Sequence, residues 1–296
     1  MRDLIRLAKG GIIFTVVITG FTGMLMAKRW VPPVWDVLWV VASLTLSSGA
    51  SALMNNLFDY DLDKNMKRTL WRSGLIDRFG KRNLWILAAV ASVLSLVPLI
   101  VFQRWWALFF TVAAIFSYAV WYTIYLKRRG PFGAIVGGLP GALPVLIGAY
   151  AVSDRFAPDV WLLFAFMMLW QPAHFWALAL KIQGEYAKGG IPVLPLVYGN
   201  EYTRLYILLY GFSLPPLALG VGLSGGYSLF YLIASSVASV HFLYRTIRGI
   251  YPQTNKDANG EVAPPQYGRA FFASIIYMMV VMLLVIADIF LSPLFH

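Results

Sequence analysis

The sequence predicts an all-α polytopic membrane protein, with about nine transmembrane helices around a central cavity, the N-terminus inside the cell and the C-terminus outside. Hydrophobic residues make up 59% of the 296 residues, charged residues only 12%, and the mean hydropathy is +0.69. Several stretches reach the roughly 18 to 20 apolar residues that span a bilayer. A chain this apolar is an integral membrane protein rather than a soluble domain with a single core.

Basic residues predict the orientation. With a cytoplasmic N-terminus, every one of the 24 Lys and Arg residues falls on the cytoplasmic side except Lys28, Arg29, Arg104 and Arg155. Anionic lipid of the cytoplasmic leaflet attracts such basic loops, so the net charge of +11 needs no nucleic acid to explain it. No RNA- or DNA-binding motif is evident. We therefore expect membrane lipid rather than nucleic acid as a partner. The expected location is the cell inner (plasma) membrane.

Nine apolar runs are each long enough to cross the bilayer. They lie at 11-27, 34-56, 83-102, 105-126, 132-152, 159-180, 204-223, 226-244 and 270-292. The first run follows three bases, as in a signal peptide, but Lys28, Arg29 and Trp30 are poor cleavage flanks and more spans follow. We interpret it as a retained first helix. No soluble domain or low-complexity linker interrupts the chain, so 1-296 is predicted to be one transmembrane domain.

The second run leads into "NNLFDYDLDKNMKRT", residues 55–69, which concentrates scarce carboxylates. If the helix continues, Asn55, Asp59 and Asp63 repeat at i, i+4 and i+8 and form one stripe about 12 Å long, while Asp61 points elsewhere. Carboxylates near an apolar boundary are costly unless a cation accompanies them. Mg²⁺ prefers oxygen ligands and commonly bridges carboxylates to substrate phosphates, so this stripe predicts a magnesium site.

Bases follow the carboxylates at Lys67, Arg68 and Arg72, where they can bind those phosphates. The plain alternative is a solvated helix end with local ion pairs. The regular spacing of the stripe, its depth at the membrane boundary and the bases that follow it favour the magnesium site.

The third and fourth runs are apolar, and the fourth ends in aromatic residues and the bases after it. Trp121 and Tyr122 are candidates for lining the cavity, although aromatic residues at a membrane interface often serve only as anchors. The fifth run is broken by a series of small and imino residues, which predicts either close helix packing or a kinked wall for a bulky tail. These residues are Gly137, Gly138, Pro140, Gly141 and Pro144.

The sixth run carries His174 just after Pro172, and Lys181 follows on the same face about 10 Å toward the cytoplasm. It ends in a polar cytoplasmic segment, "HFWALALKIQGEYAKGGIP", as the second run does, so the two faces are expected to meet at one cavity. A lone buried His is more often structural than a ligand, and His241 and His296 are expected to be structural.

The last three runs carry one acidic residue, Asp288, and the longest polar stretch of the chain, 251–269, is predicted to be a loop between the last two. The chain has no Cys, which excludes disulfides, thiolate metal sites and cysteine nucleophiles.

Three segments resemble a known family. "NNLFDYDLDKNMKRT" is similar to the first aspartate-rich motif of the intramembrane aromatic prenyltransferase (UbiA) superfamily, and its M-x-R-T run resembles the protoheme IX farnesyltransferase (heme O synthase) branch. "WQPAHFWALALKIQGEYAKGGIPVLPLV", residues 170–197, resembles the W-Q-P-x-H-F-W-x-L and Y-A-x-x-G-I-P-x-L-P segments of that branch. "YTIYLKRRGPFGAIVGGLPGALPVLIG", residues 122–148, is similar to its Y-T-x-x-L-K-R-R-x-P and G-G-x-x-G-A-L-P run. The three segments cover the central half of the chain in the family's order.

The resemblance implies a magnesium-dependent prenyltransferase that moves a farnesyl group from farnesyl diphosphate to a vinyl group of heme B, with addition of water. It further implies heme-modifying or oxidase-assembly proteins as partners. Motifs and resemblance together predict Asn55, Asp59, Asp63, Lys181 and Glu185 as catalytic residues, with Asp59, Asp63 and Glu185 as Mg²⁺ ligands. The predicted substrate-binding residues are Lys67, Arg68, Arg72, Tyr122, Lys127, His174, Trp176 and Tyr186.

The chain departs from the family most clearly in the second acidic motif. Two adjacent aspartates usually precede the Tyr of this motif, whereas Gly184 and Glu185 stand there in this chain. One carboxylate is lost and the other is a methylene longer, which predicts weaker binding of a second metal ion. Smaller departures are the Gly pair after Lys9, Ser73 in place of Pro, and Gly133 near an expected Asn.

Two other functions remain open from the sequence. A prenyltransferase for an aromatic quinone precursor would share the Asp stripe but should lack the W-Q-P-x-H-F-W segment. A divalent-cation transporter would place acidic residues near the bilayer midplane, where this chain is almost free of them.

Overall fold

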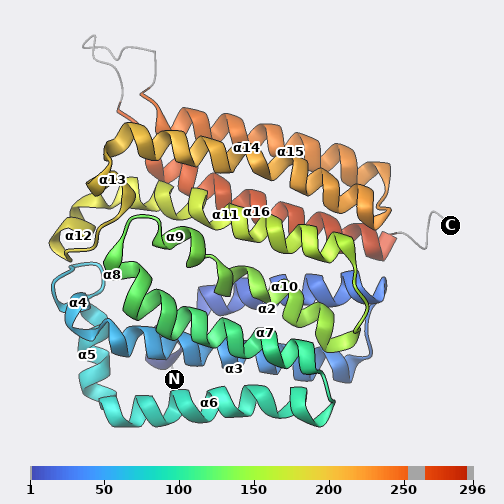
Figure 1. Ribbon diagram of the computed structural model, residues 1–296, viewed down its shortest axis with the longest axis horizontal. Coiled ribbons are helices and arrows are strands. Elements are labelled where there is room, and N and C mark those ends of the chain that lie inside the picture. Colours follow the sequence, from blue (N-terminus) through green and yellow to red (C-terminus); the bar gives the residue numbers. More distant parts are fainter. Residues whose placement is uncertain (1, 253–263, 292–296) are drawn as a thin grey trace.

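The computed structural model describes residues 2–252 and 264–291, and these residues form a bundle of roughly parallel and antiparallel helices without strands (Figure 1). In chain order the elements are α1 (Arg2–Leu7), α2 (Gly10–Lys28), α3 (Val34–Phe58), α4 (Tyr60–Lys64), α5 (Leu70–Phe79), α6 (Lys81–Val101), α7 (Trp105–Phe116), the π-helix η1 (Ser117–Leu126), α8 (Lys127–Arg129), α9 (Gly133–Val136), α10 (Leu139–Val152), α11 (Pro158–Lys181), α12 (Gln183–Lys188), α13 (Leu194–Val197), α14 (Gly199–Gly225), α15 (Leu229–Ile250) and α16 (Tyr267–Leu291).

Eight helical segments of the described chain are long and apolar enough to cross a membrane. They are Gly10–Lys28, Val34–Phe58, Lys81–Val101, Trp105–Leu126, Gly133–Val152, Pro158–Lys181, Gly199–Gly225 and Tyr267–Leu291. These correspond to eight of the nine predicted spans, and the protein is therefore an integral membrane protein. The remaining predicted span, 226–244, coincides with α15, which is equally long but carries His241 and Arg245 among its apolar residues. Nine spans and the predicted orientation stay predictions.

The end of the predicted ninth span, residue 292, lies outside the described residues, as does most of the predicted loop at 251–269. The fourth and fifth predicted spans each consist of two elements. The fourth passes from α7 into η1, and the fifth is interrupted between α9 and α10 at Gly137 and Gly138. The small residues of the fifth span thus accompany an irregular helix, as the sequence suggests.

Helices α2 and α10 pack against each other through glycines. A Cβ atom on Gly148 would lie 1.8 Å from the carbonyl oxygen of Gly20, and one on Gly23 would lie 2.1 Å from that of Val145. Any side chain at these positions would overlap backbone atoms, so the glycines are required for the close approach of the two helices. Close packing is therefore one reason for the small residues of the fifth span.

The other long helices pack in a continuous series from α6 at one edge of the bundle to α14 and α15 at the other (Figure 1). Helix α11 lies inside this series, in contact with α10, α14 and α16. Large side chains fill the interior between them: Phe166 meets the ring of Tyr277 at 5.6 Å, and Phe242 stacks on Tyr277 at 4.6 Å. Such contacts hold α16 against both α11 and α15.

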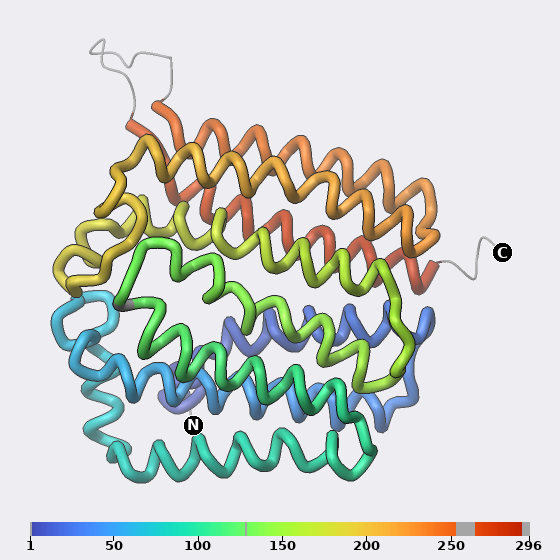
Figure 2. The backbone as a smooth tube through the Cα atoms, in the orientation of Figure 1, coloured from blue at the N-terminus to red at the C-terminus, as the bar shows by residue number. Residues whose placement is uncertain are grey.

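The short helices gather at one end of the bundle (Figure 2). There the segment after α3 meets the segment after α11, because the side chains of Met66, Tyr186, Ile191 and Val193 form one buried apolar cluster. The two polar segments that the sequence analysis compared therefore lie beside each other, and the site is found between them.

Candidate active site

A cavity of about 320 Å³ opens among α3, α4, α5, η1 and α11 at the end of the bundle that carries the short helices. Helix α3 ends at Phe58, yet Asp59 N donates to Asn55 O at 2.9 Å and Asp63 N donates to Asp59 O at 2.8 Å. The helical spacing thus continues across the junction into α4. As a result Asn55, Asp59 and Asp63 all line the cavity, and none is more than 4% exposed, whereas Asp61 is exposed elsewhere.

Asp59 is held by two donors on one of its oxygens. Its Oδ2 accepts from Lys127 Nζ at 2.7 Å and from Asn55 Nδ2 at 3.1 Å. Asn55 Nδ2 also donates to Thr123 Oγ1 on η1 at 2.9 Å, which fixes the amide orientation. The other carboxylate oxygen, Asp59 Oδ1, is buried and has no hydrogen-bond partner. A buried carboxylate oxygen without a partner is costly and is available to a cation.

Asp63 pairs with Arg72, whose Nη1 lies 3.3 Å from Asp63 Oδ2. Arg72 comes from α5, and Arg68 lines the same cavity from the turn between α4 and α5. The side chains of the cavity wall therefore include Arg68, Arg72 and Lys127, three of the predicted phosphate-binding bases.

A fourth base, Lys9, is a cavity residue that the sequence analysis did not single out. Its Nζ donates to Asn55 Oδ1 at 2.5 Å and to Tyr118 OH at 2.9 Å. Lys9 lies between α1 and α2 with a positive φ of 59°, so the chain turns there and directs this side chain inward. The signal in the sequence is the Gly pair that follows Lys9, which marks a turn rather than an uninterrupted helix.

Opposite the carboxylates, α11 contributes Gln171, His174 and Phe175 to the cavity. The His174 ring is stacked between Trp170 and Phe271, with both ring centroids 4.5 Å away. His174 Nδ1 lies 2.8 Å from Ser274 Oγ, and that hydroxyl donates its own proton to Phe271 O at 2.7 Å. The tautomer with Nδ1–H donating to Ser274 Oγ satisfies both hydrogen bonds, and in that tautomer the lone pair is on Nε2.

Aromatic residues complete the wall. Tyr122 lines the cavity and stacks on Tyr118 with centroids 6.2 Å apart. Tyr186, on α12, lines it from the other side beside Phe175. Burial raises the pKa of Tyr186, although the positive charges of Arg68 and Arg72 act to lower it. The phenol therefore stays neutral near pH 7 and can donate to an anionic oxygen.

Four predicted site residues do not line this cavity: Lys67, Trp176, Lys181 and Glu185. Lys67 is exposed next to Arg68. Trp176 is fully buried against Tyr206 and Tyr210 of α14, at centroid distances of 5.6 and 5.3 Å. Lys181 extends toward α16, where its Nζ lies 5.2 Å from the Phe272 ring centroid.

Glu185 lies on α12, one residue from the cavity residue Tyr186. Its Oε2 is buried and has no partner. In the described chain no group of three or more His, Cys, Asp or Glu side chains is arranged to hold a metal ion. The residues that fit Mg²⁺ are thus two carboxylates in one cavity, one of which has a free buried oxygen.

A second, apolar cavity of about 180 Å³ continues from the first toward the interior. The two share Ile12, Tyr118, Gly137 and Gln171. Gln171 Nε2 donates to Gly138 O, and it fits there because a Cβ on Gly141 would lie 2.4 Å from that nitrogen. The combined space is polar at the mouth and apolar inside.

Charge makes the mouth suited to an anion. Four cationic side chains, those of Lys9, Arg68, Arg72 and Lys127, face two carboxylates, which leaves an excess of two positive charges before any metal ion binds. An elongated molecule with an anionic head and an apolar tail matches both the charge and the order of the two cavities.

Comparison with known proteins identifies the family of this chain. The sequence matches the UbiA prenyltransferase family over residues 16–275. The protoheme IX farnesyltransferase of Geotalea uraniireducens is 36% identical over 270 residues, which are 91% of this chain and 100% of that protein. The protein of the same name from Teredinibacter turnerae is 34% identical over 292 residues, 99% of this chain and 91% of that protein.

Solved structures share the fold at low sequence identity. A digeranylgeranylglyceryl phosphate synthase superposes with a TM-score of 0.77 at 18% identity, covering 97% of this chain and 98% of that one. A UbiA homologue from Archaeoglobus fulgidus, bound to DMAPP and Mg²⁺, has a TM-score of 0.68 at 12% identity and covers 95% and 98% of the two chains. On the extent of the family match and of these relatives, the chain belongs to the UbiA prenyltransferase family and is similar along its length to the protoheme IX farnesyltransferases.

Proposed function

We propose that this protein transfers the farnesyl group of farnesyl diphosphate to a vinyl group of heme B, with addition of water, giving heme O and diphosphate. The observation that carries the proposal is the paired cavity, whose cationic mouth holds two carboxylates and leads into an apolar interior. The names of the relatives, protoheme IX farnesyltransferase, support heme B as the acceptor in preference to a quinone precursor.

The diphosphate end would bind at the mouth. Arg68, Arg72 and Lys127 supply donors to its oxygens, and Lys9 adds a fourth positive charge. The farnesyl chain would then extend between α3 and α10 into the apolar cavity. The first carbon of the chain would then lie near Tyr118, which lines both cavities, and near Tyr122 beside it.

Asp59 and Asp63 would hold Mg²⁺, because they are the two carboxylates of the mouth and Asp59 Oδ1 has no other partner. Bound there, Mg²⁺ supplies Lewis-acid neutralisation of the diphosphate. Lys127 and Arg72 contact Oδ2 of Asp59 and of Asp63, so both cations would lie beside the diphosphate and could stabilise the charge that it gains. Asn55 orients Asp59 through its amide.

The reaction proposed is ionisation followed by capture. The bond between the first farnesyl carbon and the diphosphate oxygen breaks, and its electron pair leaves with the diphosphate, whose added charge the surrounding cations stabilise. The π faces of Tyr118 and Tyr122 stabilise the allylic cation. The terminal carbon of the vinyl group donates its π electrons to form the new carbon–carbon bond, water adds to the adjacent carbon, and that water loses one proton.

His174 supports binding of the acceptor. Its ring is fixed by stacking and by Ser274, and Nε2 is the nitrogen with a free lone pair. That nitrogen can ligate the heme iron or accept the proton that the added water loses.

The surroundings of the reaction belong to the same proposal. We place the active site toward the cytoplasm in the inner membrane, because the cavity opens at the end of the bundle that carries most of the basic loops. Heme-modifying or oxidase-assembly proteins would then exchange the porphyrin at this side.

The test is product mass. Purified protein in lipid nanodiscs would be incubated with heme B, farnesyl diphosphate and Mg²⁺, with parallel reactions in which 4-hydroxybenzoate replaces heme B. We expect a hydroxyethylfarnesyl porphyrin only in the heme reactions. A prenylated benzoate together with unchanged heme would refute the assignment of the acceptor. If neither product forms under these conditions, the transferase assignment is refuted.

A further inference from the structure

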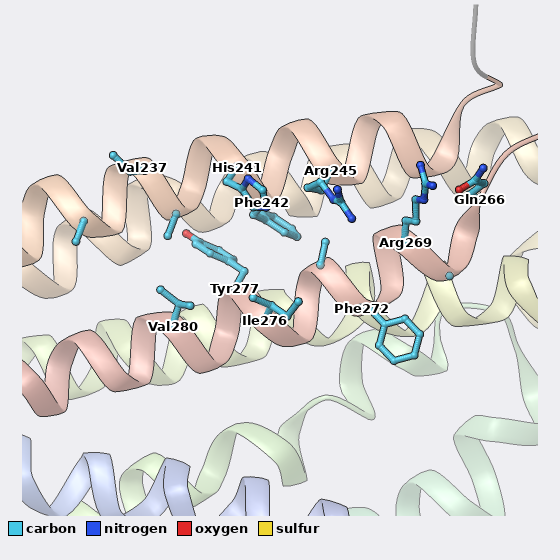
Figure 3. Close-up of a pocket in the computed structure, with 14 residues that line it drawn as sticks. Val237, His241, Phe242, Arg245, Gln266, Arg269, Phe272, Ile276, Tyr277 and Val280 are labelled. Carbon is cyan, nitrogen blue, oxygen red and sulfur yellow. The ribbon is translucent and has the colours of Figure 1, made fainter. Parts of the chain in front are cut away.

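A groove of about 1000 Å³ lies between α15 and α16 (Figure 3). Its walls are mainly apolar, with Val237 on α15 and Phe272, Ile276 and Val280 on α16. The groove shares no lining residue with the cavity that contains Asp59. It is thus a second site candidate, on another face of the bundle.

One end of the groove is cationic. Arg245, near the end of α15, and Arg269, near the start of α16, both line it together with the amide of Gln266 (Figure 3). Neither guanidinium has an ion-pair partner within the described residues. Two positive charges that no described carboxylate pairs with, beside an apolar wall, favour an anionic ligand whose remaining part is apolar.

An imidazole lies deeper in the same groove. His241 precedes Arg245 by four residues on α15, so it lies on the same helix face about 6 Å further from the cationic end. Its neighbours in the groove are apolar, including Val237 and the edge of Phe242 (Figure 3). If α15 spans the bilayer as the sequence predicts, an exposed imidazole on its outer face is costly without a partner, which makes it a candidate ligand.

We propose that this groove is a binding site for an iron porphyrin dicarboxylate, with His241 as the axial ligand of iron and Arg245 and Arg269 as the partners of the two carboxylates. The inference rests on the proposed function, which requires a porphyrin of this class as acceptor. It adds a site outside the catalytic cavity, at which the porphyrin is held before or after transfer.

The order of the three groups distinguishes a porphyrin from a phospholipid. An anionic phospholipid would satisfy both arginines, but its acyl chains would lie against His241 and leave the imidazole without a partner. An iron porphyrin carries both carboxylates at one edge and its iron within the flat apolar ring. Bases at one end and an imidazole one turn deeper match that order.

Helix α16 separates the groove from the catalytic cavity. Phe272 and Ile276 face the groove. On the other side of the helix, Phe271 stacks on the His174 ring and Ser274 Oγ is hydrogen-bonded to His174 Nδ1. The two sites thus use opposite sides of one helical wall, and a porphyrin in the groove lies next to the helix that supports its proposed catalytic partner.

The test is a spectroscopic titration of the whole protein in zwitterionic nanodiscs, without farnesyl diphosphate. The probes are heme B, iron-free protoporphyrin IX and the dimethyl ester of heme B. The variants are His241→Ala and the double change Arg245→Gln with Arg269→Gln. Arg248→Gln, on the same helix but outside the groove, is the matched control, and His174→Ala reports the catalytic cavity.

We expect His241→Ala to alter the Soret band of bound heme B and to leave protoporphyrin binding unchanged. The double arginine variant should weaken heme B binding by at least about tenfold, as expected for lost hydrogen bonds to charged groups, and should leave the dimethyl ester unaffected. Arg248→Gln should behave like the wild type in every titration.

Three results would overturn the proposal. If His241→Ala keeps the wild-type spectrum and heme B affinity while His174→Ala loses both, heme binds in the catalytic cavity alone. If His241→Ala then still makes the farnesylated porphyrin, the proposed function stands. If phosphatidylglycerol displaces heme B from the groove and heme B binding does not depend on His241, the groove is a lipid site. Absence of heme binding by the wild type would overturn both the groove and the proposed acceptor.

Discussion

Lys127 is the base whose removal separates a role in substrate binding from a role in folding. Its Nζ contacts Asp59 Oδ2 at 2.7 Å, and the two side chains are 13% and 2% exposed. Lys127→Met removes the charge and keeps much of the side-chain length. In the substrate-free protein the change leaves Asp59 with the Asn55 amide as its remaining donor. In the proposed substrate complex it removes one of the four cations that would surround the diphosphate.

The two effects change different measured quantities. Loss of one hydrogen bond between charged groups corresponds to about 1.5–3 kcal/mol, which is about a 10- to 150-fold increase in the farnesyl diphosphate concentration for half-saturation. Loss of the partner of Asp59 should lower the free energy of unfolding by about 1–3 kcal/mol, less than for a fully enclosed pair because the cavity admits water. Adding Asp59→Asn to Lys127→Met should recover that stability without recovering turnover.

The assay is steady-state farnesyl transfer at varied farnesyl diphosphate and fixed heme B, with thermal unfolding measured on the same preparations. Lys67→Met is the matched control, because Lys67 is exposed and lies outside the cavity. The reasoning requires half-saturation by farnesyl diphosphate to rise in Lys127→Met and not in Lys67→Met, with half-saturation by heme unchanged. An unchanged value for farnesyl diphosphate together with a lower melting temperature would make Lys127 a structural partner of Asp59 only.

Three further outcomes are expected from other parts of the structure. Asp63→Asn should abolish Mg²⁺-dependent turnover in the same farnesyl-transfer assay, while Asp61→Asn, which changes an exposed carboxylate, should not; equal loss in both would contradict the cavity assignment. Gly184→Asp should lower the Mg²⁺ concentration needed for half-maximal turnover and Glu185→Ala should raise it, and coinciding Mg²⁺ titrations would remove α12 from the metal site. Gly148→Ala should overpack α2 against α10, lower the free energy of unfolding by about 1–3 kcal/mol or more, and so lower the melting temperature. Gly184→Ala, with open space around it, should change neither.

The residues of the carboxylate stripe could be predicted because their spacing has a single helical interpretation. Asn55, Asp59 and Asp63 share a face whether the helix is continuous or, as here, ends and restarts at Asp59, since the i to i−4 hydrogen bonds persist. The long apolar helices were predictable for a similar reason, because length and hydropathy decide whether a helix can span the bilayer.

The orientation of single side chains around a helix was not predictable to the same degree. Trp176 and Lys181 belong to the segment that resembles the family, yet Trp176 faces α14 and Lys181 faces α16. Which side chains of α11 face the cavity depends on the packing of α10, α14 and α16 around it, and the polar residues Gln171, His174 and Lys181 do not by themselves fix that direction. Lys9 was missed because its inward direction arises from a left-handed backbone conformation at the turn between α1 and α2.

The most direct test of the central claim is a structure of the protein with Mg²⁺ and a non-hydrolysable thio analogue of farnesyl diphosphate. The account predicts the diphosphate among Asp59, Asp63, Arg72 and Lys127, with the prenyl chain in the apolar cavity between α3 and α10. A diphosphate bound at Arg245 and Arg269 in the groove between α15 and α16, with the Asp59 cavity empty, would contradict it.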